Sequence, residues 1–208
     1  MTARTRKSSH ERRRELIAAA GALFAERGYD ATRVSDIVAA VGVSQATFFW
    51  YFPTKEHILV AMMEELVNEL VRLAAEMRET SLSAREQVLA LVAKTFDLFV
   101  PRLELVELFH RRLPAQELYR VQSEILNRLL DALAGIIAEG VAKGEIEAPA
   151  PEITALLIIQ MVHGASEATI LPGAAEKHAA LDRVLAASQH LIAKALAPQP
   201  AFERADSS

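Results

Sequence analysis

The residues best suited to a chemical task lie in the segment TRVSDIVAAVGVSQATFFWYF, at positions 32–52. Two short helical patterns are separated there by a three-residue turn, which is helix-turn-helix spacing. Gly42 supplies the permissive backbone of the turn, and Val43 would fill the angle between the two helices. Ser44 would cap the second helix, whose exposed start offers Gln45, Ala46 and Thr47.

Such a helix start has the chemistry needed to read the edges of base pairs. Its N-terminus is free to enter a major groove, small residues allow close approach, and the Gln45 amide can pair bidentately with adenine. The alternative is an ordinary helical hairpin, which any helix-glycine-helix pattern also fits.

The aromatic residues that follow favour DNA binding over the hairpin. Five stand in a row, and a helix of 3.6 residues per turn cannot bury them all in one core: Phe48, Phe49, Trp50, Tyr51 and Phe52. Some must therefore be exposed beside the polar helix start. With Lys55 close behind them, they suit packing against sugar and phosphate.

Helices must position this segment, because no stretch of the sequence shows the alternation of apolar and polar residues that is typical of a half-buried strand. A capping box at Ser8–Glu11 predicts the start of a first helix, and Gly28 predicts its end. A long helix is expected over about 54–79. Prolines and glycines divide the rest of the chain into helices over about 83–100, 101–114, 115–143, 151–171 and 175–196. We expect an all-α protein of about nine helices.

Charge is distributed unevenly along the 208 residues. Residues 1–60 carry nine Lys/Arg against six Asp/Glu, a net of +3, whereas residues 61–208 carry 14 against 21, a net of −7. A polyanion would bind the first segment and be repelled by the second. The N-terminus lacks the apolar stretch of a secretory signal, and the uncharged run between Glu152 and Glu167 holds 14 residues, too few for a membrane span. We therefore expect a cytoplasmic protein without a membrane partner.

Motifs for catalysis are missing from the sequence. It contains no cysteine, no glycine-rich phosphate loop, no HExxH and no nucleophile elbow. We accordingly expect no enzyme activity, catalytic residue, metal site or cofactor. A helical adaptor that binds another protein through its N-terminal segment is the remaining alternative to a DNA-binding protein.

The segment GYDATRVSDIVAAVGVSQATFFWYFPTKEHIL resembles the DNA-binding segment of the TetR family of transcriptional regulators. The resemblance implies that Gln45, Ala46, Thr47 and Trp50 face the groove, and that Ser44, Tyr51 and Lys55 hold the phosphate backbone.

Two positions depart from the family pattern. Phe49 replaces a tyrosine whose hydroxyl reaches phosphate, so only packing remains there. Arg33 stands where a capping Ser or Thr is usual, so either Thr32 caps the second helix one residue early or Arg33 gives up the cap for a phosphate contact.

The domain organisation follows from the same resemblance. We expect a three-helix DNA-binding domain over residues 1–53 with a flexible basic arm at 1–8, a larger ligand-binding and dimerisation domain over 54–197, and a flexible tail at 198–208. Apolar surface on the last two helices favours a homodimer formed through them. Polar residues within apolar helices are the candidate pocket residues for a small-molecule effector: His110, Asn127, Gln160 and His163.

The expected function is a ligand-responsive homodimeric repressor that a small molecule releases from an inverted-repeat operator in double-stranded DNA. The alternative is a transcriptional activator of the same fold. The long helix over 54–79 would link the DNA-binding segment to the ligand-binding body.

Replacing Gln45 by Ala should weaken binding to the cognate operator by about 1 to 3 kcal/mol and relax base preference, because the amide would no longer read a base edge. Lys55→Ala, which removes a contact expected at phosphate, should weaken cognate and random duplexes alike. Titration of both duplexes with both variants tests the assignment, and an equal loss of specificity in the two variants would contradict it.

Overall fold

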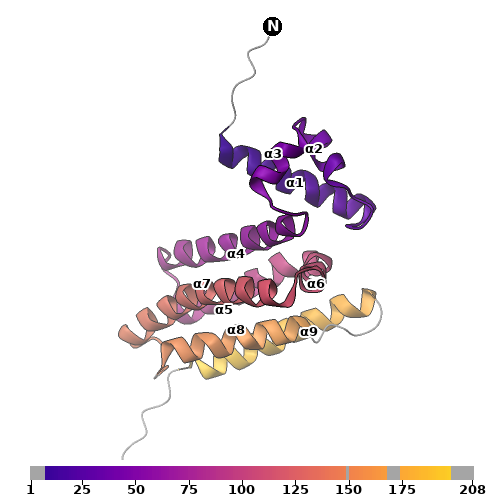
Figure 1. The fold of residues 1–208 in the computed structure, drawn as a ribbon. Coiled ribbons are helices and arrows are strands. Elements are labelled where there is room, and N and C mark those ends of the chain that lie inside the picture. Colours follow the sequence, from indigo (N-terminus) through magenta and orange to yellow (C-terminus); the bar gives the residue numbers. More distant parts are fainter. Residues whose placement is uncertain (1–7, 149, 168–173, 198–208) are drawn as a thin grey trace, which may run out of the picture. The chain divides into compact units, whose positions relative to one another are not determined.

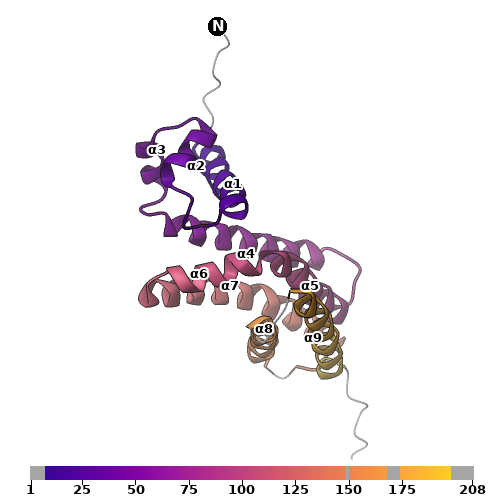
Figure 2. The same ribbon diagram turned by 90° about the vertical axis from the view of Figure 1, so that its right-hand side faces the viewer.

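The structure, a computed structural model, describes residues 8–148, 150–167 and 174–197. Its described residues form nine α-helices and one short 3-10 helix, with no strand among them (Figures 1 and 2). In chain order these are α1 (Ser9–Arg27), α2 (Val34–Val41), α3 (Gln45–Tyr51), α4 (Glu56–Arg78), α5 (Ala84–Phe99), η1 (Val100–Arg102), α6 (Leu103–Arg112), α7 (Ala115–Ala142), α8 (Pro151–Glu167) and α9 (Ala174–Ala195). The all-α fold class is confirmed. Most of the expected arm, the expected tail and the expected helix end at Leu171 lie outside the described residues.

The helices belong to two compact units. The first unit comprises the chain up to Glu65 together with Glu104–Leu118, and the second comprises Leu66–Leu103 and the chain from Tyr119 onward. The first unit thus holds the three helices of the expected DNA-binding domain, and it also contains the start of α4 and most of α6. None of the described helices is both long enough and apolar enough to cross a membrane.

Helix α1 begins and ends where its sequence signals place it. The Ser8 Oγ accepts a hydrogen bond from the backbone N–H of Glu11 at 3.2 Å, and the Glu11 carboxylate accepts one from the Ser8 N–H at 2.7 Å. At the other end Gly28 has a φ of +82°, which a side chain would disfavour, and its N–H donates to the Phe24 carbonyl. Both predicted boundaries are confirmed.

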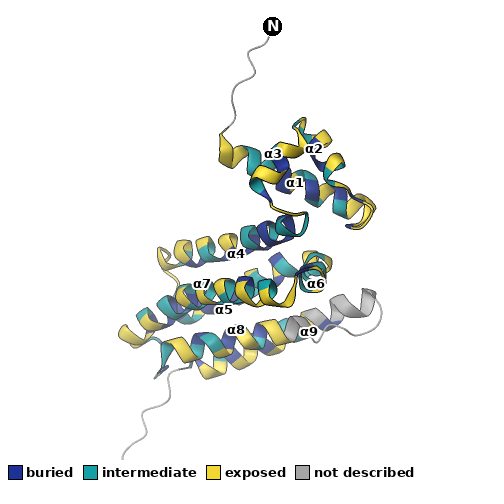
Figure 3. Cartoon of the chain, in the orientation of Figure 1, coloured by how far each residue is buried: buried dark blue, intermediate teal, exposed yellow. Residues whose placement is uncertain are grey.

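The first unit has its own hydrophobic core beneath α1, α2 and α3. The N-terminal turns of α4 contribute to it, and α2 packs against both α1 and α3. Figure 3 shows buried positions alternating with exposed ones along α1, as expected of an amphipathic helix. The core side chains are Leu16, Ile17, Ala20, Leu23, Ile37, Val38, Phe48, Phe52, Ile58 and Ala61.

The second unit is built around a larger aliphatic core. Helix α9 packs against both α5 and α8, and side chains from α5, α7, α8 and α9 form the interior. The glycine at position 140 of α7 lies so close to α5 that a Cβ atom there would stand 2.3 Å from the Ala84 Cβ. The Glu145 carboxylate accepts a hydrogen bond from the Ala84 N–H at 2.6 Å, which holds the start of α5 in place.

Candidate nucleic-acid interface

Helix α3 presents the residues expected to read DNA. Gly42 adopts the left-handed conformation at φ +71° that the tight turn before α3 requires. The Ser44 Oγ accepts a hydrogen bond from the backbone N–H of Thr47 at 3.1 Å and lies 2.9 Å from the Thr47 hydroxyl. Ser44 is therefore the N-cap, as predicted. Gln45 and Ala46 are exposed in the first turn, and Thr47 is half-buried.

The aromatic block is divided between core and surface. Phe48 and Phe52 have relative exposures of 0% and 2%, whereas Phe49 and Trp50 have 50% and 73%. Tyr51 is half-buried, and its ring meets the Trp50 ring edge-on with the centroids 4.5 Å apart. The prediction that some of these side chains must be exposed is confirmed. Phe49 and Trp50 thus add exposed aromatic surface to the helix that begins with the exposed Gln45.

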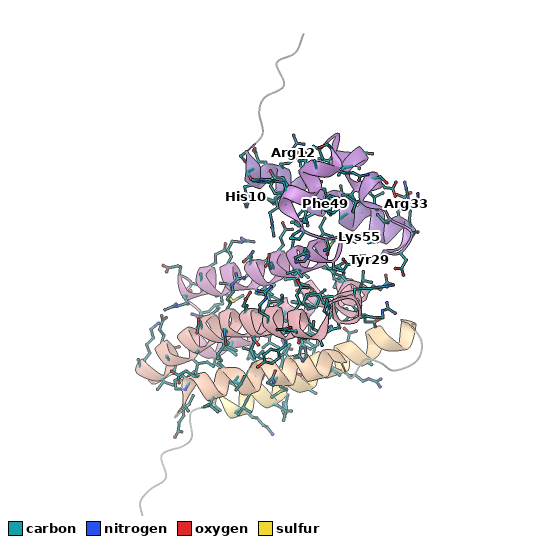
Figure 4. The ribbon with its side chains drawn as sticks, viewed as in Figure 1. His10, Arg12, Tyr29, Arg33, Phe49 and Lys55 are labelled. Atoms are coloured by element: carbon teal, nitrogen blue, oxygen red, sulfur yellow. The ribbon has the colours of Figure 1, made fainter. Side chains whose placement is uncertain are left out.

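The start of α2 decides between the two interpretations of its cap. Thr32 is 1% exposed, and its hydroxyl donates to the Gly28 carbonyl at 2.8 Å, so it does not cap α2. Arg33 occupies the N-cap position, where its side chain forms no capping hydrogen bond. The Asp36 carboxylate instead accepts from the Arg33 N–H at 2.9 Å. The alternative in which Thr32 caps the helix early is wrong, and the exposed Arg33 side chain projects from the helix start (Figure 4).

Lys55 lies against the turn that precedes α2 rather than projecting into solvent. Its Nζ donates to the carbonyl of Tyr29 at 2.7 Å and to that of Thr32 at 2.9 Å, and it stands 3.8 Å from the centre of the Tyr29 ring (Figure 4). The Tyr29 hydroxyl donates to the Glu56 carboxylate at 2.9 Å. These contacts join the first turn of α4 to the connection between α1 and α2.

Burial and hydrogen bonding shift the ionisation of the groups in this cluster. Desolvation lowers the pKa of Lys55, although the charges of Asp30 and Glu56 oppose that shift. Burial also raises the pKa of Tyr29, and its hydrogen bond to Glu56 adds to the rise. Desolvation acts to raise the pKa of Glu56 as well, but hydrogen bonds from Thr54, its own backbone and Tyr29 outweigh it and leave that pKa below its usual value. Tyr29 therefore stays protonated as the donor to an ionised Glu56.

Helices α6 and α7 contribute side chains to the same part of the first unit. Arg112, at the end of α6, forms an ion pair with Asp30 and lies 5.5 Å from the centre of the Tyr29 ring. The His57 Nε2 lies 3.1 Å from the Glu117 carboxylate. Sequence analysis missed these partners, because residues so far apart in the chain share no periodic pattern.

The residues expected to line a ligand pocket lie on α6, α7 and α8 at half-buried or exposed positions. His110 is half-buried on α6, with its Nδ1 2.8 Å from the Val106 carbonyl oxygen. Asn127 is exposed on α7, and Gln160 and His163 are exposed on α8. No group of three potential metal ligands occurs among the described residues.

Two substitutions at Ser44 should separate capping from DNA binding. Ser44→Ala loses the N-cap hydrogen bond and should reduce the free energy of unfolding by about 1 kcal/mol. Ser44→Asp keeps an acceptor for the Thr47 N–H but places a negative charge at the edge of the reading surface, so stability should be retained while affinity for duplex DNA falls. Thermal unfolding and a DNA titration measure the two effects. Unchanged DNA affinity in the Asp variant would show that this helix start lies away from the phosphates.

Sequence comparison relates both parts of the chain to known regulators. Residues 16–62 match the family described as bacterial regulatory proteins, tetR family, and residues 62–192 match the C-terminal region of YsiA-like proteins. The fatty acid metabolism regulator protein of Bacillus subtilis is 30% identical over 158 residues, which cover 75% of this chain and 80% of that protein. The transcriptional repressor KstR2 of Rhodococcus jostii is 28% identical over 136 residues, covering 64% of this chain and 67% of the repressor.

Solved structures share the fold. The regulator FadR of Bacillus subtilis, crystallised with stearoyl-CoA, superposes with a TM-score of 0.67 at 25% identity and covers 88% of this chain and 98% of its own. The fatty acid degradation regulator FadR of Bacillus halodurans gives a TM-score of 0.68 at 23% identity, covering 94% of this chain and 100% of its own. Together with the matches that run from residue 16 to residue 192, these likenesses identify the chain as a member of the TetR family, a DNA-binding transcriptional regulator rather than an enzyme.

Proposed function

We propose that this regulator is a homodimeric repressor that binds an inverted-repeat operator and leaves it when a long-chain fatty acyl-CoA binds to the second unit. The observation that carries the proposal is the exposed surface of α3, where Gln45, Ala46 and Trp50 lie on a helix that packs against the core of the first unit. A regulator of this kind acts where the chromosome lies, and we assign it to the cytoplasm.

The candidate DNA-contacting residues of the first unit divide into two roles. Gln45, Ala46, Thr47 and Trp50 face the bases, because they lie on the first turns of a helix whose N-terminus is open to a groove. The residues that hold the sugar-phosphate backbone surround them: Arg33, Ser44, Phe49 and Tyr51. Phe49 acts by packing, since its ring has no hydroxyl to donate to phosphate.

Similarity to known regulators supports repression as the mode of regulation and an acyl-CoA as the effector. KstR2 is a repressor, and the Bacillus subtilis relatives comprise a regulator of fatty acid metabolism and a FadR structure that contains stearoyl-CoA. The second unit offers a fitting environment, because many aliphatic side chains around its core are only partly buried, including Leu89, Leu91, Leu130, Ile159 and Met161. A hydrocarbon chain gains about 0.8 kcal/mol per CH₂ group that it buries.

A row of exposed residues on α8 supports the homodimer. Ile153 and Leu157 are 55% and 63% exposed, and Gln160 and Gly164 continue the row at helical spacing. Leu191 on the neighbouring α9 is 55% exposed. Pairing these two helices with a second copy would form a four-helix interface and cover the apolar side chains. Gln160 then belongs to the interface rather than to the ligand pocket.

Substituting Leu157 by Lys should dissociate the dimer, because it would bury two unpaired charges near the two-fold axis. The loss of bivalency should also weaken operator binding. Tyr119→Lys is the matched control: Tyr119 is 75% exposed on α7, away from the proposed interface, so this variant should stay dimeric. Analytical ultracentrifugation gives the masses, and a dimeric Leu157→Lys protein would rule out α8 as the interface.

Stearoyl-CoA should weaken operator binding by a factor of ten to a hundred, which corresponds to about 1.4 to 2.8 kcal/mol of coupling. Because coupling is reciprocal, operator DNA should weaken stearoyl-CoA binding by the same factor. The measurement is a fluorescence-anisotropy titration of a labelled operator, with coenzyme A lacking the acyl chain as the control. Equal operator affinity with and without saturating stearoyl-CoA would exclude acyl-CoA as the effector.

A further inference from the structure

We infer that Lys55 is a positioning residue of the DNA-binding unit: it braces the turn that precedes α2, and the phosphate contact at this site is made by Arg33. The inference rests on the proposed DNA-binding surface. It departs from the role that the family resemblance implies for Lys55, which is direct contact with phosphate.

The ammonium group of Lys55 is already engaged by the protein. Two of its three N–H bonds point to the carbonyl oxygens of Tyr29 and Thr32, at 2.7 and 2.9 Å. The face of the Tyr29 ring lies 3.8 Å from the same nitrogen. Only one N–H bond remains for a phosphate oxygen, and the Tyr29 ring occupies part of the space around the nitrogen.

The charges around Lys55 also disfavour an anion at this position. Glu56 follows it directly in the chain, and the carboxylates of Asp30 and Glu56 both act on the Lys55 charge. A phosphate group approaching Lys55 would meet the negative potential of the adjacent Glu56 carboxylate, whereas the Asp30 carboxylate is paired with Arg112. Arg33 differs in that its side chain is exposed, while the Asp36 carboxylate binds its backbone N–H.

The braced turn sets the position of Arg33. Residues 29–32 form a turn in which the Thr32 N–H donates to the Tyr29 carbonyl at 3.2 Å, and Lys55 binds the carbonyls at both ends of that turn. Arg33 is the next residue and the N-cap of α2. Removing the Lys55 donors would take the Lys55 partner from both carbonyls, leaving that of Tyr29 with the Thr32 N–H alone, and would loosen the backbone from which the Arg33 side chain extends.

The test compares Lys55→Met with Arg33→Met in the full-length protein. Both substitutions keep an unbranched side chain and remove the charge and the donors. The probe is a duplex recovered by the wild-type protein from a random-sequence pool. Each phosphate contact contributes about 0.9 to the slope of log Kd against log salt concentration, so loss of one contact per subunit lowers a dimer's slope by about 1.8. We expect that decrease for Arg33→Met. For Lys55→Met we expect about tenfold weaker binding with a smaller decrease in slope, because Arg33 still reaches phosphate from the loosened turn.

A double-mutant cycle separates positioning from a general loss of stability. Independent substitutions multiply their fold-losses to within about twofold. If Lys55 acts through Arg33, Lys55→Met should weaken binding by less than about threefold in the Arg33→Met background. Should Lys55→Met lack a helical circular dichroism spectrum, Lys55→Gln, which keeps a neutral donor, replaces it in both measurements.

Three results would overturn the inference: a slope that falls as far in Lys55→Met as in Arg33→Met, fold-losses that multiply in the double variant, or wild-type affinity in Lys55→Met. These results leave the proposed function standing. A wild-type protein that retains no duplex from the pool would overturn the proposed function together with the inference.

Discussion

Burial of Phe48 and Phe52 is the interaction on which the DNA-reading surface depends. Phe48 lies on α3, Phe52 is the residue that caps the end of α3, and both rings are almost completely buried. Each contributes on the order of 1.5 to 3 kcal/mol of hydrophobic stabilisation. This burial fixes the rotation of α3 about its own axis. Phe49 and Trp50 consequently face outward, and Gln45 and Ala46 are exposed in the turn before them.

Polar contacts complement the hydrophobic core where the backbone leaves its helices. The connection between α1 and α2 has no aliphatic residue as deeply buried as Phe48, and it is held by Lys55, which directly precedes α4, and by Arg112 from α6. Both cations also lie near the ring of Tyr29, at 3.8 and 5.5 Å from its centre. Cation–π contacts and hydrogen bonds thus hold a turn that apolar packing alone would leave free to shift.

The features that sequence analysis could predict are those encoded by residues close together in the chain. The Ser8–Glu11 capping box, the end of α1 at Gly28 and the Ser44 cap each involve residues only a few positions apart. The sequence left two candidates for the N-cap of α2. Which of them caps the helix depends on whether the Thr32 hydroxyl binds a carbonyl at the end of α1. The pairing of Arg112 with Asp30 joins residues 82 positions apart, and no local pattern reveals it. Helix α8 is apolar nearly all round, so its sequence alone does not show which face is exposed or that Gln160 lies on it.

Trp50 is the chain's single tryptophan, and it is the most exposed of the large side chains on α3. Intrinsic tryptophan emission from this protein therefore originates at one position on the surface that we assign to the bases. The indole ring lies far from a deeply buried environment, so its spectrum responds to whatever covers α3. The aliphatic core of the second unit contains no tryptophan. The protein consequently carries a built-in optical reporter of occupancy at its reading helix.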